Sequence, residues 1–208
     1  ELFTRYRARI LPIARPKSMS QLRRALLETA ALLESAQLQE AAQRLGQALP
    51  LDPKNYELLY TVAALQEVAG NLEDAESLVR KVVQLSPRHF EAWMLFAKLL
   101  RTFPDEHADA AEALRRAAEL RPDEAEPRIQ LTEIFLDTEQ LQAALETAQE
   151  AVLLQRDGDT LCLLGEVFLA RGEAAKAIAA LKEASGHLPG DLGVRELLAE
   201  SYLLAGER

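Results

Sequence analysis

One interval recurs along this chain of 208 residues: about every 34 residues, a proline follows an apolar run with helical spacing. Pro53, Pro87 and Pro122 lie 34 and 35 residues apart, and Pro189 ends a similar run. Arg156 stands 34 residues after Pro122 and 33 before Pro189, so the period continues where the proline is missing. Proline ends helices because it disfavours the helical conformation of the residue before it. A period of roughly 20 to 50 residues is typical of an array of repeated units.

Each period contains two segments with apolar residues at helical spacing, joined by a short turn. In the second period the segments are YELLYTVAALQEVAG and LEDAESLVRKVVQL, with Gly70 and Asn71 at the junction. Gly172 occupies the same place in the fifth period, and glycine is a common helix stop. The composition, with 49% hydrophobic residues, few aromatics and much Ala, Leu and Glu, also favours helices. We therefore expect an all-α fold without strands.

Small residues recur at fixed places within these segments. The second segment of every period has an alanine at one position, and three periods add a large residue followed by a small one. These residues are Ala41, Ala75, Ala110, Ala144 and Ala177, then Leu45 with Ala48, Leu114 with Ala117, and Leu181 with Ala184. Together with the period and its closing proline, they resemble the tetratricopeptide repeat family over about residues 20–206. In that family a small side chain lets paired helices approach closely.

The resemblance implies a right-handed α-α superhelix, a solenoid of about five helix pairs followed by a lone C-terminal helix. It also implies that Leu164, Gly165 and Phe168 face the partner helix in the fifth repeat. The third repeat has RTFPDEH in place of the turn glycine, so we expect a bulge at Phe103 and Pro104. The solenoid is expected to span residues 20–208, with repeats at 22–55, 56–89, 90–124, 125–157 and 158–191 and a partial repeat at 192–208.

The start of the chain is basic and the rest is acidic. Between Glu1 and Arg24 there are seven basic residues and one acid, a net charge of +6. Because the whole chain has a net charge of −9, the residues after Arg24 carry a net charge of −15. Residues 1–19 form either a basic arm that touches nucleic acid, anionic lipid or an acidic protein surface, or a solvated first helix. We favour the solvated helix, because one short cluster carries the charge, and we expect no nucleic-acid partner.

The residues that most often carry catalysis or bind metals are few and scattered. The histidines are far apart and near helix ends, where a solvated or capping role is expected, and the one cysteine has no nucleophile signature around it. These residues are His89, His107, His187 and Cys162. The acids around Gly158 lack the spacing of a calcium loop, and no phosphate-binding glycine loop is present. We therefore expect no enzyme activity, no catalytic residue, no cofactor and no metal.

By the resemblance, the first helices of the repeats line a concave groove that binds a partner. The groove residues that we single out are Glu57, Tyr60, Glu67, Glu91, Met94, Lys98, Arg101, Glu126, Ile129, Glu133, Asp137 and Glu166. The resemblance also places Arg23, Leu26, Ala30, Glu34, Ala64, Asp159, Cys162, Leu169, Glu196 and Glu200 there. The clamp with which some family members grip acidic peptide tails is absent, because its positions are Leu26, Ala30, Thr61, Glu91 and Leu95.

Acids outnumber bases in this groove, so a basic or amphipathic partner segment is expected. The resemblance therefore predicts a non-enzymatic scaffold that binds a protein or peptide. The alternative is a docking or regulatory segment of a larger enzyme or envelope assembly protein with further domains. The chain begins at Glu1 and its pattern breaks off at Arg208, so we expect a longer protein.

The last helical pattern, from about Asp191 to Ala205, has no following helix to cover its leucines. Repeat arrays need polar caps, so we expect this surface to pack on a second copy or on further chain. No apolar run approaches the roughly 20 residues that span a bilayer, so no membrane span is expected. One cysteine leaves both cytoplasm and periplasm open as locations, and we favour the cytoplasm.

Overall fold

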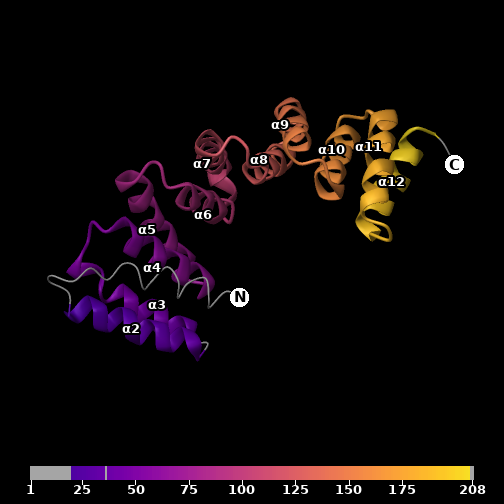
Figure 1. Cartoon of the computed structure of the whole chain (residues 1–208). Helices are drawn as coiled ribbons and strands as arrows, with labels where there is room; N and C mark the ends of the chain where they lie inside the picture. The colour runs from indigo at the N-terminus through magenta and orange to yellow at the C-terminus, as the bar shows by residue number, and fades with distance from the viewer. Residues whose placement is uncertain (1–19, 36, 207–208) are drawn as a thin grey trace. The chain divides into compact units, whose positions relative to one another are not determined.

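The computed structural model describes residues 20–35 and 37–206 (Figure 1). Within these ranges the secondary structure is helical throughout, with eleven α-helices, two short 3-10 helices and no strand. The expected all-α fold is therefore confirmed. The handedness of the superhelix and the number of repeats stay predictions, and the predicted basic arm at residues 1–19 lies outside the described residues.

The chain divides into two compact units, the first ending at Glu106 and the second beginning at His107. This boundary lies within the predicted third repeat, residues 90–124. The first unit contains α2 (Ser20–Glu34), α3 (Leu38–Gly46), η2 (Leu49–Leu51), α4 (Tyr56–Val68), α5 (Leu72–Leu85), α6 (Phe90–Leu100) and η3 (Pro104–Glu106). The second unit contains α7 (His107–Leu120), α8 (Glu126–Asp137), α9 (Leu141–Leu154), α10 (Gly158–Ala170), α11 (Ala174–His187) and α12 (Leu192–Leu204).

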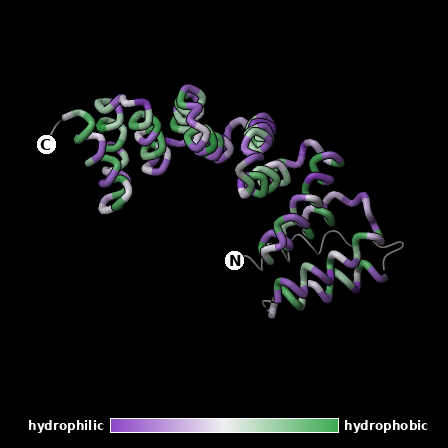
Figure 2. The backbone as a smooth tube through the Cα atoms, turned by 180° about the vertical axis from the view of Figure 1, so that it is seen from behind, coloured by the Kyte–Doolittle hydropathy of each residue, from purple (hydrophilic) through white to green (hydrophobic). Residues whose placement is uncertain are grey.

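Within each unit, helices that follow one another in the chain pack together as antiparallel neighbours. The contacts are most extensive for α4 with α5, α8 with α9, and α10 with α11, and those of α2 with α3 equal those of α11 with α12. Polar and apolar residues alternate along these helices, so each has an apolar side that its neighbours cover (Figure 2). This pairing is the one that the two-segment period predicts.

The small residues picked from the sequence lie where the paired helices meet. The five recurring alanines are all fully buried, and the large and small residues that follow them are no more than 2% exposed. Gly165 on α10 shows why size matters, because a Cβ added there would lie 2.5 Å from Cγ of Leu181 on α11. The close crossing predicted from the small residues is therefore confirmed for α10 and α11.

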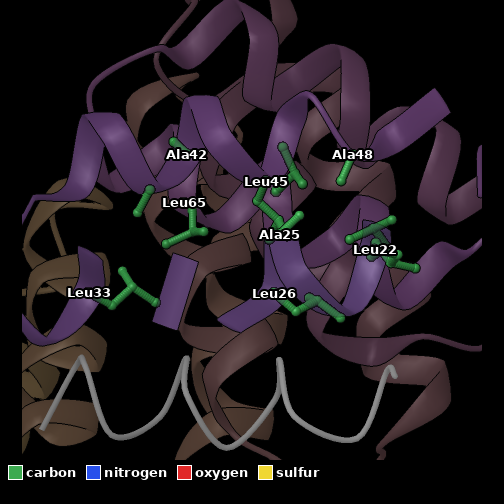
Figure 3. Packing of buried hydrophobic residues seen from close by; sticks show 11 residues of the cluster. Leu22, Ala25, Leu26, Leu33, Ala42, Leu45, Ala48 and Leu65 are labelled. Carbon is green, nitrogen blue, oxygen red and sulfur yellow. The ribbon is translucent and has the colours of Figure 1, made fainter. Parts of the chain in front are cut away.

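A leucine-rich cluster joins the first three helices of unit one (Figure 3). Leu22 and Leu26 from α2 meet Leu45 from α3 and Leu65 from α4, and each is at most 2% exposed. Burying a leucine contributes about 1.5–3 kcal/mol relative to leaving it in water. These contacts hold α2 and α3 against α4 although α3 has only nine residues.

The first helices of successive repeats begin with a side-chain cap. Asn55, His89 and Asp191 each follow a repeat-ending proline by two residues, and each accepts a hydrogen bond from the backbone N–H three residues later. Asp157 caps α10 in the same way and forms a reciprocal capping box with Thr160. Such caps satisfy N–H groups that the helix itself leaves unpaired. The expected capping role is confirmed for His89.

The turns between paired helices use a left-handed backbone residue. Gly70 has φ of 85° and Gly172 has φ of 75°, which glycine adopts without steric cost. Glu139 stands at the same place between α8 and α9 with φ of 55°, although it has a Cβ. The expected bulge at Phe103 and Pro104 takes the form of a turn that leads into η3.

We predict that Gly165→Val destabilises the chain by about 1–3 kcal/mol, because the added side chain overlaps buried Leu181. The matched control is Gly186→Val on α11, where an added Cβ would have no atom within 4 Å. Urea unfolding of both variants measures the difference. Equal unfolding free energies would show that the α10–α11 crossing does not require a small residue.

Candidate partner-binding faces

The first helices of the repeats lie next to one another within each unit. In unit one α4 contacts α6, and in unit two α10 contacts both α8 and α12. Side chains at matching positions of these helices therefore form a continuous face in each unit.

The groove residues predicted from the sequence differ in exposure. Five are exposed: Glu57, Lys98, Glu126, Asp137 and Glu166. Six are half-buried, namely Glu67, Glu91, Met94, Arg101, Ile129 and Glu133, and Tyr60 is buried.

The face of unit one is partly neutralised by its own residues. Lys98 Nζ on α6 lies 2.6 Å from Glu67 Oε1 on α4, so two of the predicted groove charges pair with each other. Tyr60 is only 8% exposed, and its ring centroid lies 4.7 Å from that of His89. Tyr60 therefore offers little surface to a partner, and the same holds for Leu26 and Ala30 on α2, which are also buried.

His89 fills the space between α4 and the start of α6. Its Nδ1 accepts the Ala92 N–H at 3.1 Å, which requires the imidazole nitrogen to be unprotonated. The carboxylates of Glu91 and Glu57 lie 3.4 and 3.9 Å from Nδ1 and Nε2 of the ring. These contacts give His89 a structural role at the junction of two repeats.

Unit two has an acidic face, which we define as Glu133 and Asp137 on α8 with Asp159 and Glu166 on α10. Among the residues that the structure describes, Asp137, Asp159 and Glu166 form no ion pair. Although Glu166 as a whole residue is exposed, partial desolvation of its carboxyl raises its pKa, and the neighbouring carboxylates of Glu133 and Asp137 raise it further. Asp137, Asp159 and Glu166 therefore concentrate negative charge that no ion pair among the described residues neutralises.

Cys162 lies within this acidic surrounding on α10. Burial raises the pKa of its thiol, and the carboxylates of Glu166, Asp191 and Asp159 raise it further. A thiol with a raised pKa stays protonated at neutral pH and is a poor nucleophile. Asp191 lies near Cys162 because it caps the start of α12, and the sequence contains no pattern that links the two residues.

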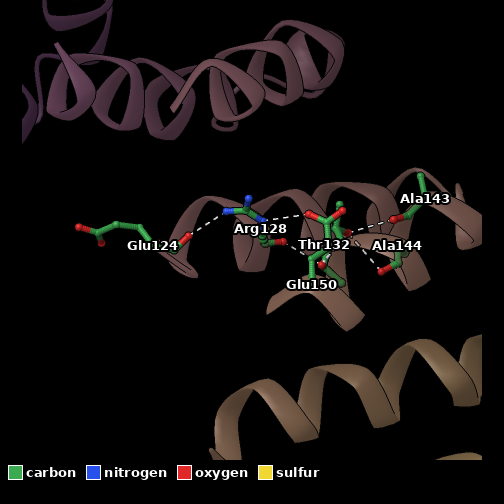
Figure 4. Close-up of polar contacts among 7 residues, drawn as sticks. Glu124, Arg128, Thr132, Ala143, Ala144 and Glu150 are labelled. Carbon is green, nitrogen blue, oxygen red and sulfur yellow. Dashed lines mark hydrogen bonds and ion pairs between the residues drawn. The ribbon is translucent and has the colours of Figure 1, made fainter. Parts of the chain in front are cut away.

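Two basic residues of unit two, Arg128 and Arg156, pair with acids on other helices. Arg128 on α8 donates from Nε to the Glu150 carboxylate on α9 at 2.9 Å and from Nη1 to the Glu124 carbonyl oxygen at 3.1 Å (Figure 4). Arg156 makes two hydrogen bonds of 2.7 Å to the Glu183 carboxylate on α11. These contacts engage both cations away from the acidic face.

Neither a membrane span nor a metal cluster occurs in the part of the chain that the structure describes. No helix in these ranges is long and apolar enough to cross a bilayer. No group of three or more His, Cys, Asp or Glu side chains in the same ranges is placed to hold a metal ion.

We predict that Glu166→Gln raises the melting temperature modestly at pH 7. The pKa of Glu166 lies above its ordinary value of 4.5, so the folded chain holds this proton more tightly than the unfolded chain, and stability falls as pH rises through that window. The gain should vanish below about pH 4, where the carboxyl is protonated in both states. Thermal unfolding against pH measures it.

The control for this prediction is Glu183→Gln, which should have the opposite sign. The hydrogen bonds from Arg156 hold the pKa of Glu183 below its usual value, so the charged form stabilises the folded chain at neutral pH. That contribution is lost as pH falls through the lowered pKa, and the variant should melt lower than the parent only above that range. If both variants changed stability in the same direction at pH 7, the charge assignment would be wrong.

Comparison with known proteins agrees with the helix pairs and their small residues. Residues 32–100 match the sequence model of the tetratricopeptide repeat family, and no curated protein sequence matches the chain. Three solved structures share the fold. "MamA 41-end" from Desulfovibrio magneticus RS-1 is 19% identical with a TM-score of 0.76, covering 85% of this chain and 99% of its own.

The second is YrrB, described as a TPR protein with an unusual peptide-binding site, which is 18% identical with a TM-score of 0.73, covering 94% of this chain and 97% of its own. The third is TTC0263, a thermophilic TPR protein in Thermus thermophilus. It is 21% identical with a TM-score of 0.58, covering 87% of this chain and 98% of its own. Residues 32–100 therefore match tetratricopeptide repeats in sequence, and the described residues share the helix-pair fold of solved tetratricopeptide repeat proteins.

Proposed function

We propose that the chain is a non-enzymatic scaffold whose unit two binds a basic or amphipathic segment of a partner protein on its acidic face. The observation that carries this proposal is the set of carboxylates at Asp137, Asp159 and Glu166, none of which forms an ion pair within the described residues. Lysine or arginine side chains of a partner would supply the missing positive charge. YrrB, which shares the fold, is described as having a peptide-binding site.

The distribution of charge between the units supports the choice of unit two. Residues 107–208 contain 20 acids and 10 basic residues, whereas residues 20–106 contain 12 acids and 9 basic residues. The excess negative charge of the chain is therefore concentrated in the second unit. Such a field speeds the encounter with a basic partner and disfavours acidic ones.

Apolar side chains among these acids would provide contact area. Ile129 on α8 and Leu169 on α10 are half-buried, so part of each side chain remains accessible. A few apolar anchors usually carry most of the affinity of an interface, while charges around them steer the encounter and select the sign of the partner. A segment that alternates basic and apolar residues would satisfy both features.

We predict that a synthetic peptide of lysine and leucine binds the chain and that its association rate falls as salt shortens the Debye length from about 10 Å at 0.1 M. A matched peptide of glutamate and leucine should not bind. Glu133→Lys with Asp137→Lys should slow association at least about tenfold and flatten its salt dependence, because these changes reverse charge on the α8 side of the acidic face. Stopped-flow fluorescence measures the rates.

The control is Asp109→Lys with Glu146→Lys, which makes the same change in net charge on α7 and α9. Both of these acids are exposed and lie on the second helices of their repeats. If this control lowered the rate as much as the α8 variant, net charge alone would explain the effect, and the proposed face would be wrong.

The surface of α12 supports a second proposal, association with another copy of the chain. Leu192, Leu203 and Leu204 are 70%, 72% and 52% exposed. Large leucines exposed together on one helix are unfavourable in water, and burial of each in an interface would contribute about 1.5–3 kcal/mol. Two copies could cover these side chains with one another.

We predict that the chain forms a dimer that Leu203→Glu converts to a monomer, because a charge at this position opposes burial. Leu153→Glu is the control, since Leu153 is 86% exposed but lies on α9. Light scattering coupled to size-exclusion chromatography gives the mass of each variant. A parent chain of monomeric mass at high concentration would rule out this association.

A further inference from the structure

A cationic pocket lies in unit one, where α2 meets α3. It is an open cavity of about 300 Å³ bounded by α2, α3 and the η2 turn. Its wall consists of Gln21, Arg24, Ala25, Arg44, Gln47, Ala48 and Leu51, so it contains two guanidinium groups and no carboxylate. The wall of this cavity is therefore positively charged, although the chain as a whole has a net charge of −9.

The two arginines share one acid, Glu28 on α2. Arg24 Nε donates to Glu28 Oε1 at 2.8 Å, and Arg44 Nε donates to the other carboxylate oxygen. These hydrogen bonds hold the pKa of Glu28 below its usual value, so the acid stays charged. One carboxylate therefore balances two cations, and one positive charge remains uncompensated.

Donors remain available on the pocket wall. A guanidinium has five N–H groups, and Arg24 uses only its Nε–H on an acceptor among the described residues. Arg44 Nη1 donates to the Gln47 side-chain oxygen at 3.4 Å, which leaves the amide NH₂ of Gln47 as a further donor. The side chains of Arg24 and Arg44 are 78% and 40% exposed, so a ligand can reach both.

The floor of the pocket is apolar. Ala25 and Ala48 belong to the core cluster of α2 and α3 (Figure 3), and Leu51 on η2 is 48% exposed. The floor is therefore fixed by buried packing, while the two arginines stand above it. An aliphatic stem would contact the floor while a charged head group meets the arginines.

We propose that this pocket binds a ligand with a carboxylate on a short aliphatic stem. A planar carboxylate matches the fork of a guanidinium and can accept two of its hydrogen bonds. One carboxylate also carries the single negative charge that the Arg24–Glu28–Arg44 cluster leaves uncompensated. The pocket is separate from the acidic face, and it selects an anion where that face selects cations.

The test is a titration of the ¹⁵N-labelled full chain with butyrate, a single carboxylate on a short aliphatic stem, at constant ionic strength, followed through the arginine Nε–Hε NMR signals. The signals of Arg24 and Arg44 should shift and saturate together. The signal of Arg80 should not move, because Arg80 on α5 pairs with its own acid, Glu76, and lies outside the pocket wall. Arg80 thus serves as the internal control.

Three variants sharpen the test. Arg44→Gln should weaken butyrate binding at least about threefold, and Arg80→Gln should leave it unchanged. Glu28→Gln should tighten binding about threefold, because it removes the carboxylate that competes for both arginines. If the cluster were only a structural ion-pair network, Glu28→Gln would not tighten binding. An unchanged or weaker affinity in Glu28→Gln would therefore overturn the proposal, and so would equal losses in Arg44→Gln and Arg80→Gln. Thermal melting of each variant confirms that it is folded.

Two further titrations identify the carrier of the carboxylate. Tighter binding of acetyl-Ala-Glu-Ala-amide than of butyrate would support a carboxylate on a peptide, and the reverse order would support a free small molecule. Inorganic phosphate is the comparison anion. If phosphate shifted the Arg24 and Arg44 signals at lower concentration than either carboxylate, or if none of the three shifted them, the carboxylate site would be wrong.

Discussion

The close approach of paired helices is the constraint on which the rest of this structure depends. Alanines with no exposed surface mark the crossings in both units, and at Gly165 even a methyl group would overlap Leu181. Because backbones separated by small side chains leave little freedom in crossing geometry, each helix presents one fixed side to its partner. The opposite side of each first helix does not take part in this crossing, so its residues are not restricted in size by it.

Basic and acidic side chains are divided between the second and first helices of the repeats in unit two. In unit two, Arg115 on α7 lies 5.7 Å from the ring centroid of Phe135, and Lys182 on α11 lies 5.4 Å from that of Tyr202. Each cation covers an aromatic ring 20 residues further along the chain, on the first helix of the next repeat. Basic side chains on second helices therefore help to join successive repeats. The first helices α8 and α10 keep their acids, and their only base, Arg128, turns toward Glu150.

The sequence predicted those parts of the fold that rest on period and residue size. The proline spacing and the recurring alanines predicted the helix pairs and their crossings, and Gly70 and Gly172 predicted two of the turns. The positive φ of Glu139 could not be predicted from the sequence, because a glutamate side chain does not favour that backbone conformation. Among the predicted groove residues, the burial of Tyr60 and the pairing of Lys98 with Glu67 depend on side-chain positions in neighbouring repeats. The Arg24–Glu28–Arg44 cluster escaped prediction because its members are 4 and 16 residues apart and meet only after α2 and α3 pack.

Stability and recognition act in opposite directions at the acidic face. Placing Glu166 near Glu133 and Asp137 raises the pKa of Glu166, which means that its charged form is less favourable in the folded chain than in water. A partner cation bound there would relieve this repulsion and lower that pKa again. Because protonation and cation binding compete for the same carboxylates, binding of the proposed basic segment is linked to pH and strengthens as the carboxyls ionise. The unfavourable charge in the free chain thus becomes part of the free energy that favours the complex.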